Sequence, residues 1–199
     1  TSLKVKNIFE IGANYAQDAD YLMQVFNLTP DDVYVFEAHP ELFQSIKKLH
    51  KFHAYHNAVF NEDKEITFHI FPLNYQNTGW SSVYKHMSNE TTETKVQAIR
   101  MDSFMAENKI EKIDFLKIDV EGASLAVLEG FGERIKDVNC IQVEAEHLAE
   151  FSLYGAVDLY NKIADLLGNN GFELVMFERN NFNRQSDSFW IQKEYLVYR

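Results

Sequence analysis

The residues whose types and spacing best suit chemistry form the run Lys-Ile-Asp-Val-Glu-Gly at positions 117–122. An apolar segment that begins at Ile113 leads into this run, which is typical of a buried strand that ends in charged residues. A carboxylate at such a strand end can take the proton of a hydroxyl group whose oxygen attacks a second substrate. Asp119 is therefore the first candidate for a general base or for a group that orients the acceptor, and Glu121 is the second. The alternative is a structural ion-pair network of Lys117 with these two acids.

Histidines and further carboxylates offer other sites. His147 is a third candidate for the base, and a surface position at the entry to a helix is its alternative. The three-residue spacing of His50, His53 and His56 fits one helix face, but this segment crosses from helix to strand and does not favour a metal site. The chain has no Cys/His set with the spacing of zinc ligands. The carboxylates that could share a divalent ion, if folding brings them together, are Asp102, Asp119, Glu121 and Glu144.

A glycine turn near the start of the chain is the second place where a ligand could bind. The apolar segment Ile8–Ile11 stops at Gly12-Ala13-Asn14, and a helical pattern begins at once. A buried strand, a tight glycine turn and a helix N-terminus together form the usual seat of a nucleotide-like ligand. We expect backbone N–H groups of the turn to face this ligand and Glu10 to accept hydrogen bonds from its cationic or N–H group. A plain β-turn-α corner is the alternative.

A second acid helps to identify the ligand. Glu37 follows the apolar segment Val33–Phe36, and an acid at the end of the second strand suits the two hydroxyls of a ribose. The dinucleotide fingerprint G-x-G-x-x-G is absent, because Asn14 and Gln17 stand where the second and third glycines belong. S-adenosylmethionine has a ribose and an adenine but no pyrophosphate, and its amino-acid end suits acids and Asn. The residues therefore favour a methyl donor over NAD.

The rest of the chain supplies the elements that position these residues. Apolar segments and helical patterns alternate from residue 8 to residue 60, in the order β-α-β-α-β. This order predicts a parallel sheet with right-handed crossovers. Further elements are expected in the second half: a short helix at 102–108, a strand from 113, a short helix near 125–128, a strand at 138–143 and a helix at 156–167. Strands at 172–177 and 188–197 are expected to end the chain as an antiparallel hairpin.

The pattern changes between residues 64 and 101. Two strand-like segments in this range enclose a polar stretch, so we interpret it as a β excursion inserted into the sheet topology. The polar stretch carries Trp80, Ser81 and Ser82, which we expect to lie over a ligand and to contact the substrate. For Trp80, packing on the surface is an equal alternative. The segment from Ser88 to Thr94 is expected to be a solvated loop.

Composition limits the classes of function. The 199 residues, 46% of them hydrophobic, predict one domain that spans residues 1–199. The net charge of -11 argues against a sequence-independent grip on nucleic acid. The one cysteine, Cys140, lies in an apolar run and cannot form an internal disulfide. We find no signal peptide and no apolar run near the roughly 18 residues that span a bilayer, so a cytoplasmic protein is the expectation.

Several motifs together resemble the FkbM family of S-adenosylmethionine-dependent methyltransferases, and the resemblance covers nearly the whole chain. The run at 117–122, with the preceding Ile-Asp-Phe-Leu, carries most of it, because the glycine loop is generic to class I methyltransferases. The other matching motifs are Glu10-Ile-Gly-Ala-Asn14, Phe36-Glu37, Asn57-Ala58-Val59 and Gly79-x-Ser-Ser82.

The resemblance implies a Rossmann-like α/β fold with a mostly parallel, seven-stranded sheet. It implies S-adenosylmethionine as the methyl donor and an acceptor near Asp119 and Glu121. Members of the family generally methylate hydroxyls of saccharides or natural products, so the expected acceptor is a sugar of a surface glycan or its precursor. The residues expected to bind the donor are Glu10, Gly12, Ala13, Asn14, Glu37, Ala38, Asn57, Ala58 and Asp119.

Three positions depart from the family pattern and keep a second hypothesis open. Glu10 stands where the family usually has Asp, Ala16 where it has Gly, and Ser124 where an acid commonly follows the Glu-Gly pair. The second hypothesis is a non-catalytic module that keeps the fold and binds a partner. An NAD-dependent oxidoreductase is a third hypothesis, which the missing glycines disfavour. The sequence does not decide whether a metal assists or which oligomer forms.

Overall fold

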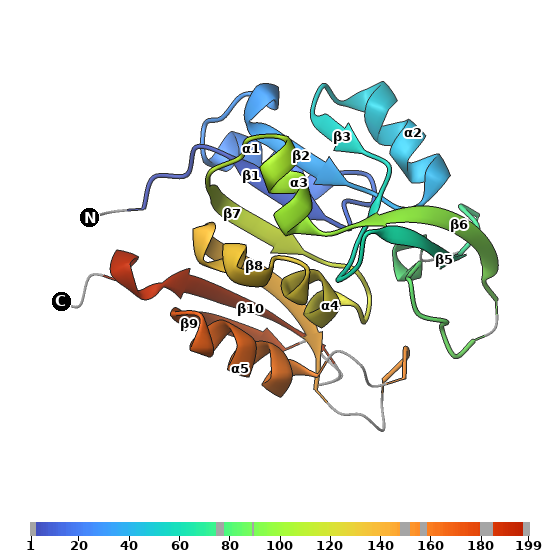
Figure 1. Cartoon of the computed structure of the whole chain (residues 1–199). Helices are drawn as coiled ribbons and strands as arrows, with labels where there is room; N and C mark the ends of the chain where they lie inside the picture. The colour runs from blue at the N-terminus through green and yellow to red at the C-terminus, as the bar shows by residue number, and fades with distance from the viewer. Residues whose placement is uncertain are drawn as a thin grey trace.

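A seven-stranded sheet and a smaller three-stranded sheet form the framework of the protein (Figure 1). The computed structural model describes residues 3–74, 78–88, 90–147, 152–155, 159–179 and 185–196. The strand order is β3-β2-β1-β7-β8-β10-β9 in the large sheet and β4-β6-β5 in the small one. The strands are β1 (Ile8–Ile11), β2 (Val33–Phe36), β3 (His53–Tyr55), β4 (Ala58–Val59), β5 (Lys64–Ile70), β6 (Thr92–Ile99), β7 (Ile113–Ile118), β8 (Val138–Glu146), β9 (Phe172–Arg179) and β10 (Gln185–Gln192).

Helices lie on both faces of the large sheet (Figure 1). On one face α1 contacts β1 and β2 and α2 contacts β3, whereas on the other face α4 and α5 contact β8. None of the described helices is long and apolar enough to cross a membrane. The helices are α1 (Gln17–Val25), α2 (Pro40–Leu49), α3 (Met101–Glu107), α4 (Ser124–Glu129) and α5 (Tyr160–Asn169), with short 3-10 turns at Pro30–Asp32, Thr78–Trp80, Gly132–Asp137 and Lys193–Tyr195.

The central strand β1 is buried on both faces because each face meets a different hydrophobic cluster. Phe9 and Ile11 belong to the larger cluster, which includes residues of α3, α4 and α5. On the opposite face Val35 of β2 packs with Ala19 of α1. Glu10 lies beside Val35 in the register, and alternation along the strand places its side chain on the α1 face. A charged residue is therefore buried on the face that α1 covers.

Parallel pairing brings three strand ends to one edge of the sheet. β1 pairs with β2 on one side and with β7 on the other, so that Ile11 lies beside both Phe36 and Ile118. The chain order reverses here, and such a switch point is where open α/β sheets bind ligands. The strand that carries the 117–122 run therefore lies directly beside the strand that carries the glycine turn. The residues that directly follow the three strands are Gly12, Glu37 and Asp119.

The later part of the sheet also follows the sequence-based prediction. β10 runs antiparallel to both β8 and β9, which confirms the antiparallel C-terminal strands. β5 and β6 pair antiparallel within residues 64–101 and form the expected β excursion. The turn between β9 and β10 and the predicted helix start at Ala156 lie outside the described residues.

Three local predictions were wrong. The segment 52–60 is divided between the two sheets, because β3 pairs with β2 whereas β4 pairs with β6. β6 begins at Thr92, so the last three residues of the loop expected at 88–94 belong to a strand that pairs with β5. The sequence predicts Asp102 or Ser103 as the N-cap of α3, but the N-cap is Arg100. The Asp102 carboxylate instead accepts hydrogen bonds from the Arg100 guanidinium.

Candidate functional site

A cavity opens at the carboxyl ends of β1, β2 and β7. Polar groups reach it from Asn14, Glu37 and Asp119. Its apolar wall combines residues of the large sheet, α2 and the three-stranded sheet, namely Phe36, Leu42, Ala58, Val59, Phe68 and Val83.

The glycine at the end of β1 is required by the close approach of β7. A Cβ atom at Gly12 would overlap the backbone carbonyl oxygen of Asp119. Gly12 also has a φ of +82°, a conformation that residues with a side chain rarely adopt. The turn after β1 therefore packs directly against the backbone at the end of β7. Gly12 adds no side-chain atoms to the cavity wall.

The backbone N–H groups of the turn contact protein atoms instead of facing the cavity. The N–H groups of Gly12 and Ala13 both donate to the carbonyl oxygen of Phe36, at 3.0 and 3.1 Å. The N–H of Asn14 donates to Glu37 Oε2 at 2.7 Å. The expectation that these groups present themselves to a ligand is wrong, because the turn uses them to close onto β2.

Asn14 supplies a polar atom that the protein itself leaves unsatisfied. Its Oδ1 is buried and has no hydrogen-bond partner among the described residues. Asn14 also lines the cavity and has a φ of 52°, which Asn tolerates better than most residues. A buried acceptor without a partner costs free energy unless a ligand donates to it. A ligand with an N–H or ammonium group would supply that donor.

Glu37 is a buried carboxylate held at the edge of the cavity. It is 6% exposed, and its two oxygens accept from the N–H groups of Asn14 and His39, at 2.7 and 2.6 Å. Burial raises the pKa of Glu37 to about 7, although these N–H groups act in the opposite direction. Each carboxylate oxygen can accept more than one hydrogen bond. Glu37 is therefore fixed in position and still able to bind a pair of ligand hydroxyls.

Glu10 lies behind the cavity rather than in it. Its Oε2 accepts from the N–H of Ala19 at 3.1 Å, and its Oε1 lies 3.8 Å from Lys117 Nζ. Burial raises the pKa of Glu10 to about 8 despite the charge of Lys117. Glu10 and Ala13 do not line the cavity. The other residues expected to bind the donor do line it: Gly12, Asn14, Glu37, Ala38, Asn57, Ala58 and Asp119.

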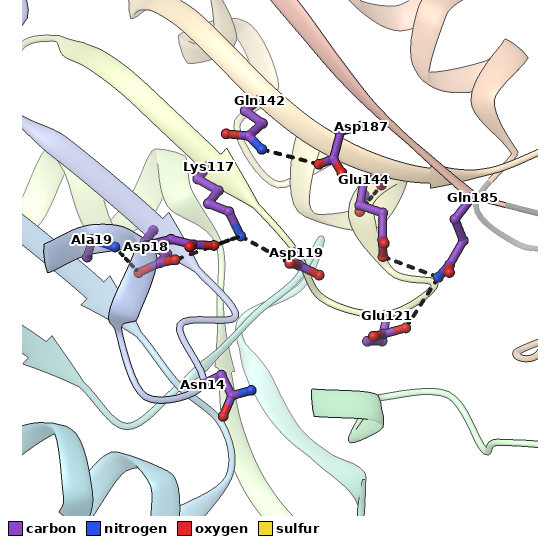
Figure 2. A network of polar contacts seen from close by, with 12 residues as sticks. Asn14, Asp18, Ala19, Lys117, Asp119, Glu121, Gln142, Glu144, Gln185 and Asp187 are labelled. Carbon is purple, nitrogen blue, oxygen red and sulfur yellow. Dashed lines mark hydrogen bonds and ion pairs between the residues drawn. The ribbon is translucent and has the colours of Figure 1, made fainter. Parts of the chain in front are cut away.

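Lys117 ties the strand ends together by ion pairs with three carboxylates. Figure 2 shows its side chain between Asp18 and Asp119, with Nζ at 2.9 and 3.0 Å from their carboxylate oxygens. Glu10 is the third partner. Burial acts to lower the pKa of Lys117, but the charges of Asp119, Glu10 and Asp18 outweigh it and raise that pKa. The structural network that the sequence left as an alternative therefore exists, and Asp119 is part of it while 41% of its side chain stays exposed.

A group of carboxyls lies next to Asp119, on the side toward β10. One oxygen each of Asp119, Glu121 and Glu144 lies within 4.8 Å of the others. Figure 2 shows Gln185 between Glu121 and Glu144, with its Nε2 at 3.5 and 3.3 Å from their oxygens. The structure thus brings together three of the four acids considered for a divalent ion, while Asp102 pairs with Arg100 elsewhere. Lys117 supplies a cation at the Asp119 end of this group.

Crowding changes the ionisation of this group. Burial, and next the charge of Asp119, raises the pKa of Glu121 to about 8 and that of Glu144 to about 10. Both carboxyls therefore hold a proton near neutral pH, whereas a carboxylate must be ionised to act as a base. No other carboxyl of this group combines exposure to the cavity with a direct contact to Lys117, as Asp119 does.

The raised carboxyl pKa values predict that the protein loses stability as the pH rises from 5 to 9. The folded state binds protons at Glu37, Glu10, Glu121 and Glu144 more tightly than the unfolded state, in which these groups titrate near 4.5. The free energy of unfolding must then fall with increasing pH. We expect the midpoint of thermal unfolding to fall by roughly 4 °C or more between pH 6 and pH 9.

Calorimetric melts of two variants test the source of this pH dependence. Glu144→Gln should reduce the slope, because it removes the carboxyl with the most strongly raised pKa value of the four. Glu133→Gln is the matched control, since Glu133 is exposed and pairs only with Lys136 among the described residues. An equal slope in wild type and Glu144→Gln would show that the carboxyl group is not the source.

The polar stretch of the β excursion borders the cavity, although its residues play different parts. Gly79 and Ser81 line the cavity. Ser82 is 1% exposed, and its hydroxyl donates to the backbone oxygen of Glu121 at 2.6 Å. Trp80 does not line the cavity, and its ring stacks on His86 with the centroids 5.5 Å apart. Of the three residues expected to contact substrate, Ser81 alone reaches this cavity.

His147 is placed away from the carboxyl group. Its ring packs against Tyr160 of α5 and Phe177 of β9, with centroids 5.3 Å from each. Burial lowers the pKa of His147. His147 neither lines the described cavity nor belongs to the group around Asp119. The structure therefore gives no support to its predicted role as a base.

Two residues of the site have no counterpart in the predictions. The hydroxyl oxygen of Tyr154 lies 3.1 Å from Glu121 Oε2, and Gln185 contacts both Glu121 and Glu144. Neither stands at the end of a parallel strand or in a recognisable motif. They reach the site through contacts that span 33 and 64 residues of sequence. The antiparallel position expected for β10 is the signal that could have pointed to Gln185.

Comparison with solved structures supports a methyltransferase-like fold at low sequence identity. An FkbM methyltransferase from Methylobacillus flagellatus KT superposes with a TM-score of 0.59 at 12% identity, over 94% of this chain and 44% of that protein. Aeropyrum pernix fibrillarin, solved with bound S-adenosyl-L-methionine, gives 0.54 at 11% identity, over 96% of this chain and 69% of that one. Magnesium protoporphyrin IX methyltransferase from Synechocystis PCC 6803, solved with bound SAH, gives 0.52 at 10% identity, over 96% and 75%.

The family assignment comes from the sequence as a whole. No curated protein matches the chain. The family model described as the methyltransferase FkbM domain matches residues 10–174. This range begins at Glu10 in β1 and ends in β9, so it contains the glycine turn, Glu37 and the 117–122 run. The chain therefore belongs to the FkbM family of methyltransferase domains.

Proposed function

We propose that the cavity beside Gly12 binds S-adenosylmethionine and that the domain transfers its methyl group to a hydroxyl of a saccharide. One observation carries the donor assignment. Glu37, Asn14 and Asp119 line, together with Gly12 of the turn, a cavity whose other wall is apolar. The methyl donors or their products in the fibrillarin and protoporphyrin methyltransferase structures agree with this assignment. The saccharide acceptor is inferred from the family resemblance.

The residues around the cavity fit the parts of this donor. The buried Oδ1 of Asn14, which has no protein partner among the described residues, would accept from the ammonium group of the amino-acid end. Glu37 would bind the two ribose hydroxyls. Ala38, Asn57 and Ala58 would lie beside the adenine, where small residues leave space for a flat ring. When bound, the donor supplies an electrophilic methyl group on a positively charged sulfur.

Asp119 is the residue that we propose to act on the acceptor. Transfer of a methyl group to a hydroxyl requires the attacking oxygen to be held in line and its proton to be removed. Asp119 lines the cavity, is 41% exposed and is oriented by Lys117 Nζ at 3.0 Å. The proton of the acceptor hydroxyl would pass to its carboxylate. Glu144, which holds a proton near neutral pH, would donate a hydrogen bond to another oxygen of the acceptor.

Replacing Glu37 by alanine should weaken donor binding by about 10- to 100-fold, the loss expected when hydrogen bonds to a charged group are removed. Titration calorimetry with S-adenosylmethionine and S-adenosylhomocysteine measures the affinity. We expect wild type to bind in the micromolar range, about -8 kcal/mol. NAD serves as the control ligand, because the missing glycines should prevent its binding.

Glu41→Ala is the matched control variant, since Glu41 stands nearby at the exposed start of α2. It should leave the affinity unchanged. Absence of binding to either compound in wild type would contradict the donor assignment, and binding of NAD alone would favour the oxidoreductase.

A non-catalytic binding module remains the second candidate function, and Ser124 favours it. Ser124 is 1% exposed, and its hydroxyl donates to the backbone oxygen of Glu144 at 2.8 Å. The position where the family commonly has an acid therefore serves the packing of α4 against β8. Donor binding without methyl transfer to any saccharide tested, in a library of glycans, would select this function.

A further inference from the structure

Tyr154 joins two parts of the site that are far apart in the sequence. Its side chain is buried, at 4% exposure. Its hydroxyl oxygen lies 3.0 Å from the carbonyl oxygen of Trp80 and 3.1 Å from Oε2 of Glu121. Trp80 belongs to the segment 78–82, in which Gly79 and Ser81 line the cavity. A single phenol oxygen thus contacts both the residue between these two cavity-lining residues and a carboxyl beside Asp119.

The 117–122 run is shaped to accept this tyrosine. Glu121 and Gly122 have φ values of 54° and 83°, so the backbone turns sharply after β7. A Cβ atom at Gly122 would lie 2.7 Å from Tyr154 Cβ, which is closer than real side-chain contacts allow. His86 packs edge-on against the tyrosine ring, with the centroids 5.3 Å apart. The glycine of the motif is therefore needed to make room for Tyr154.

A second contact holds the same two segments together. The hydroxyl of Ser82 donates to the backbone oxygen of Glu121 at 2.6 Å. The N–H of Ser82 donates in turn to His69 in β5 at 3.0 Å. Ser82 thus joins the segment 78–82 to β5. Two contacts join the segment to the turn after β7, one through the Ser82 hydroxyl and one through Tyr154.

The proton count at Tyr154 defines how this contact works. A phenol has one proton, and the carbonyl oxygen of Trp80 can only accept. Both contacts of the hydroxyl are full hydrogen bonds only when Glu121 carries a proton and donates it to the phenol oxygen. The groups that face Glu121 favour this form, because Asp119 and Glu146 add negative charge and no cation contacts Glu121 among the described residues.

We propose that Tyr154 is a positioning residue for methyl transfer, whose hydroxyl fixes the Glu121 carboxyl beside Asp119 and holds the segment 78–82 against the donor cavity. The role in transfer rests on the function proposed above, whereas the contact between the two segments does not. The affinity of the cavity for the donor and the position of Glu121 would then depend on the same hydroxyl group.

Hydrogen exchange of the Ser82 amide in Tyr154→Phe tests the proposal. The variant removes the hydroxyl and keeps the ring that packs against Gly122. We expect exchange at Ser82 to become at least about tenfold faster, as for the loss of one or two hydrogen bonds in a local opening. The amide of Asp119, which donates to Ile11 at 2.9 Å, serves as the internal reference and should not change. Tyr160→Phe in α5 is the matched control.

Two substitutions of Glu121 separate a positioning role from general packing. In Glu121→Gln the amide N–H can donate to Tyr154 as a protonated carboxyl does, so exchange at Ser82 should stay within about twofold of wild type. In Glu121→Ala the donor is lost, and exchange should accelerate as in Tyr154→Phe. Titration with S-adenosylhomocysteine should show about a tenfold loss of affinity in Tyr154→Phe and in Glu121→Ala. Glu121→Gln should keep the affinity of wild type.

The outcomes distinguish this proposal from the proposed function. Unchanged exchange at Ser82 in Tyr154→Phe would overturn the proposal even if the donor binds. Equal acceleration at Ser82 and Asp119 would also overturn it, because the variant would then be destabilised throughout. If wild type fails to bind S-adenosylhomocysteine, the donor assignment fails, while faster exchange at Ser82 alone still supports the contact through Tyr154.

Discussion

Replacing Gly12 by alanine should abolish donor binding and lower the free energy of unfolding by about 3 kcal/mol or more. Two causes act together at this residue. The new Cβ atom would overlap the carbonyl oxygen of Asp119, which is backbone and cannot rotate away. The φ of +82° would also be strained for any residue with a side chain. Relief requires β1 and β7 to separate at the point where the cavity forms.

Chemical denaturation and calorimetry check the two effects of this substitution. Gly168→Ala is the matched control, because Gly168 lies in α5 and a Cβ atom there meets nothing within 4 Å. That variant should be as stable as wild type or slightly more stable, since alanine favours the helix. A Gly12→Ala protein that binds S-adenosylhomocysteine with wild-type affinity would contradict both the close fit and the donor assignment.

Replacing Lys117 by methionine should lower the free energy of unfolding by about 3 kcal/mol at pH 9, where Glu10 with its pKa of about 8 is ionised. This loss is near the lower end for a broken buried ion pair. Asp18 and Asp119 have side chains that are 60% and 41% exposed, so water can solvate them when the cation is lost. Glu10 cannot turn to water, because its side chain is 2% exposed. The cost of the substitution therefore arises mainly from Glu10.

A second substitution tests this explanation. Glu10→Gln in the Lys117→Met background removes the stranded charge and keeps an acceptor for the N–H of Ala19, so it should restore much of the lost stability. Lys136→Met is the control for loss of a lysine, because Lys136 is 55% exposed and pairs with Glu133. Its effect should be within about 0.5 kcal/mol. Failure of the double variant to recover stability would place the cost elsewhere.

The position of the cavity could be predicted from the sequence because it follows from two local rules. Apolar segments that alternate with helical patterns predict a parallel sheet, and the carboxyl ends of its strands then share one edge. Gly12, Glu37 and Asp119 each follow such a segment directly, so their meeting needs only the strand order. The strand order, in which β2, β1 and β7 are neighbours, then brings the three residues together.

The sheet face to which the Glu10 side chain points could also have been derived from the sequence. The prediction instead placed Glu10 in contact with the ligand. Successive side chains of a strand point to opposite faces, and Glu10 alternates with Phe9 and Ile11, which belong to the main core. Its place is thus beneath α1, one residue before the strand end. An acid at the end of a strand reaches the cavity when it follows the last strand residue, as Glu37 does.

The contacts of the acceptor side could not be derived from the sequence. Tyr154 and Gln185 approach Glu121 from segments that no pattern relates to it. His147 was predicted at this site from the sequence, but its ring packs against Tyr160 and Phe177 near α5. Such contacts depend on how loops cross the end of the sheet, and the balance of many weak packing terms decides that path.

The position of β10 between β8 and β9 determines when the sheet can be completed during synthesis. β9 precedes β10 in the chain, yet it pairs with the sheet only through β10 in the part of the protein that the structure describes. A nascent chain that has reached β9 therefore leaves an open edge on β8 and a free strand with Val175 and Met176. Such edges invite pairing with other chains. Synthesis of β10 covers the open edge of β8 and gives β9 its pairing partner.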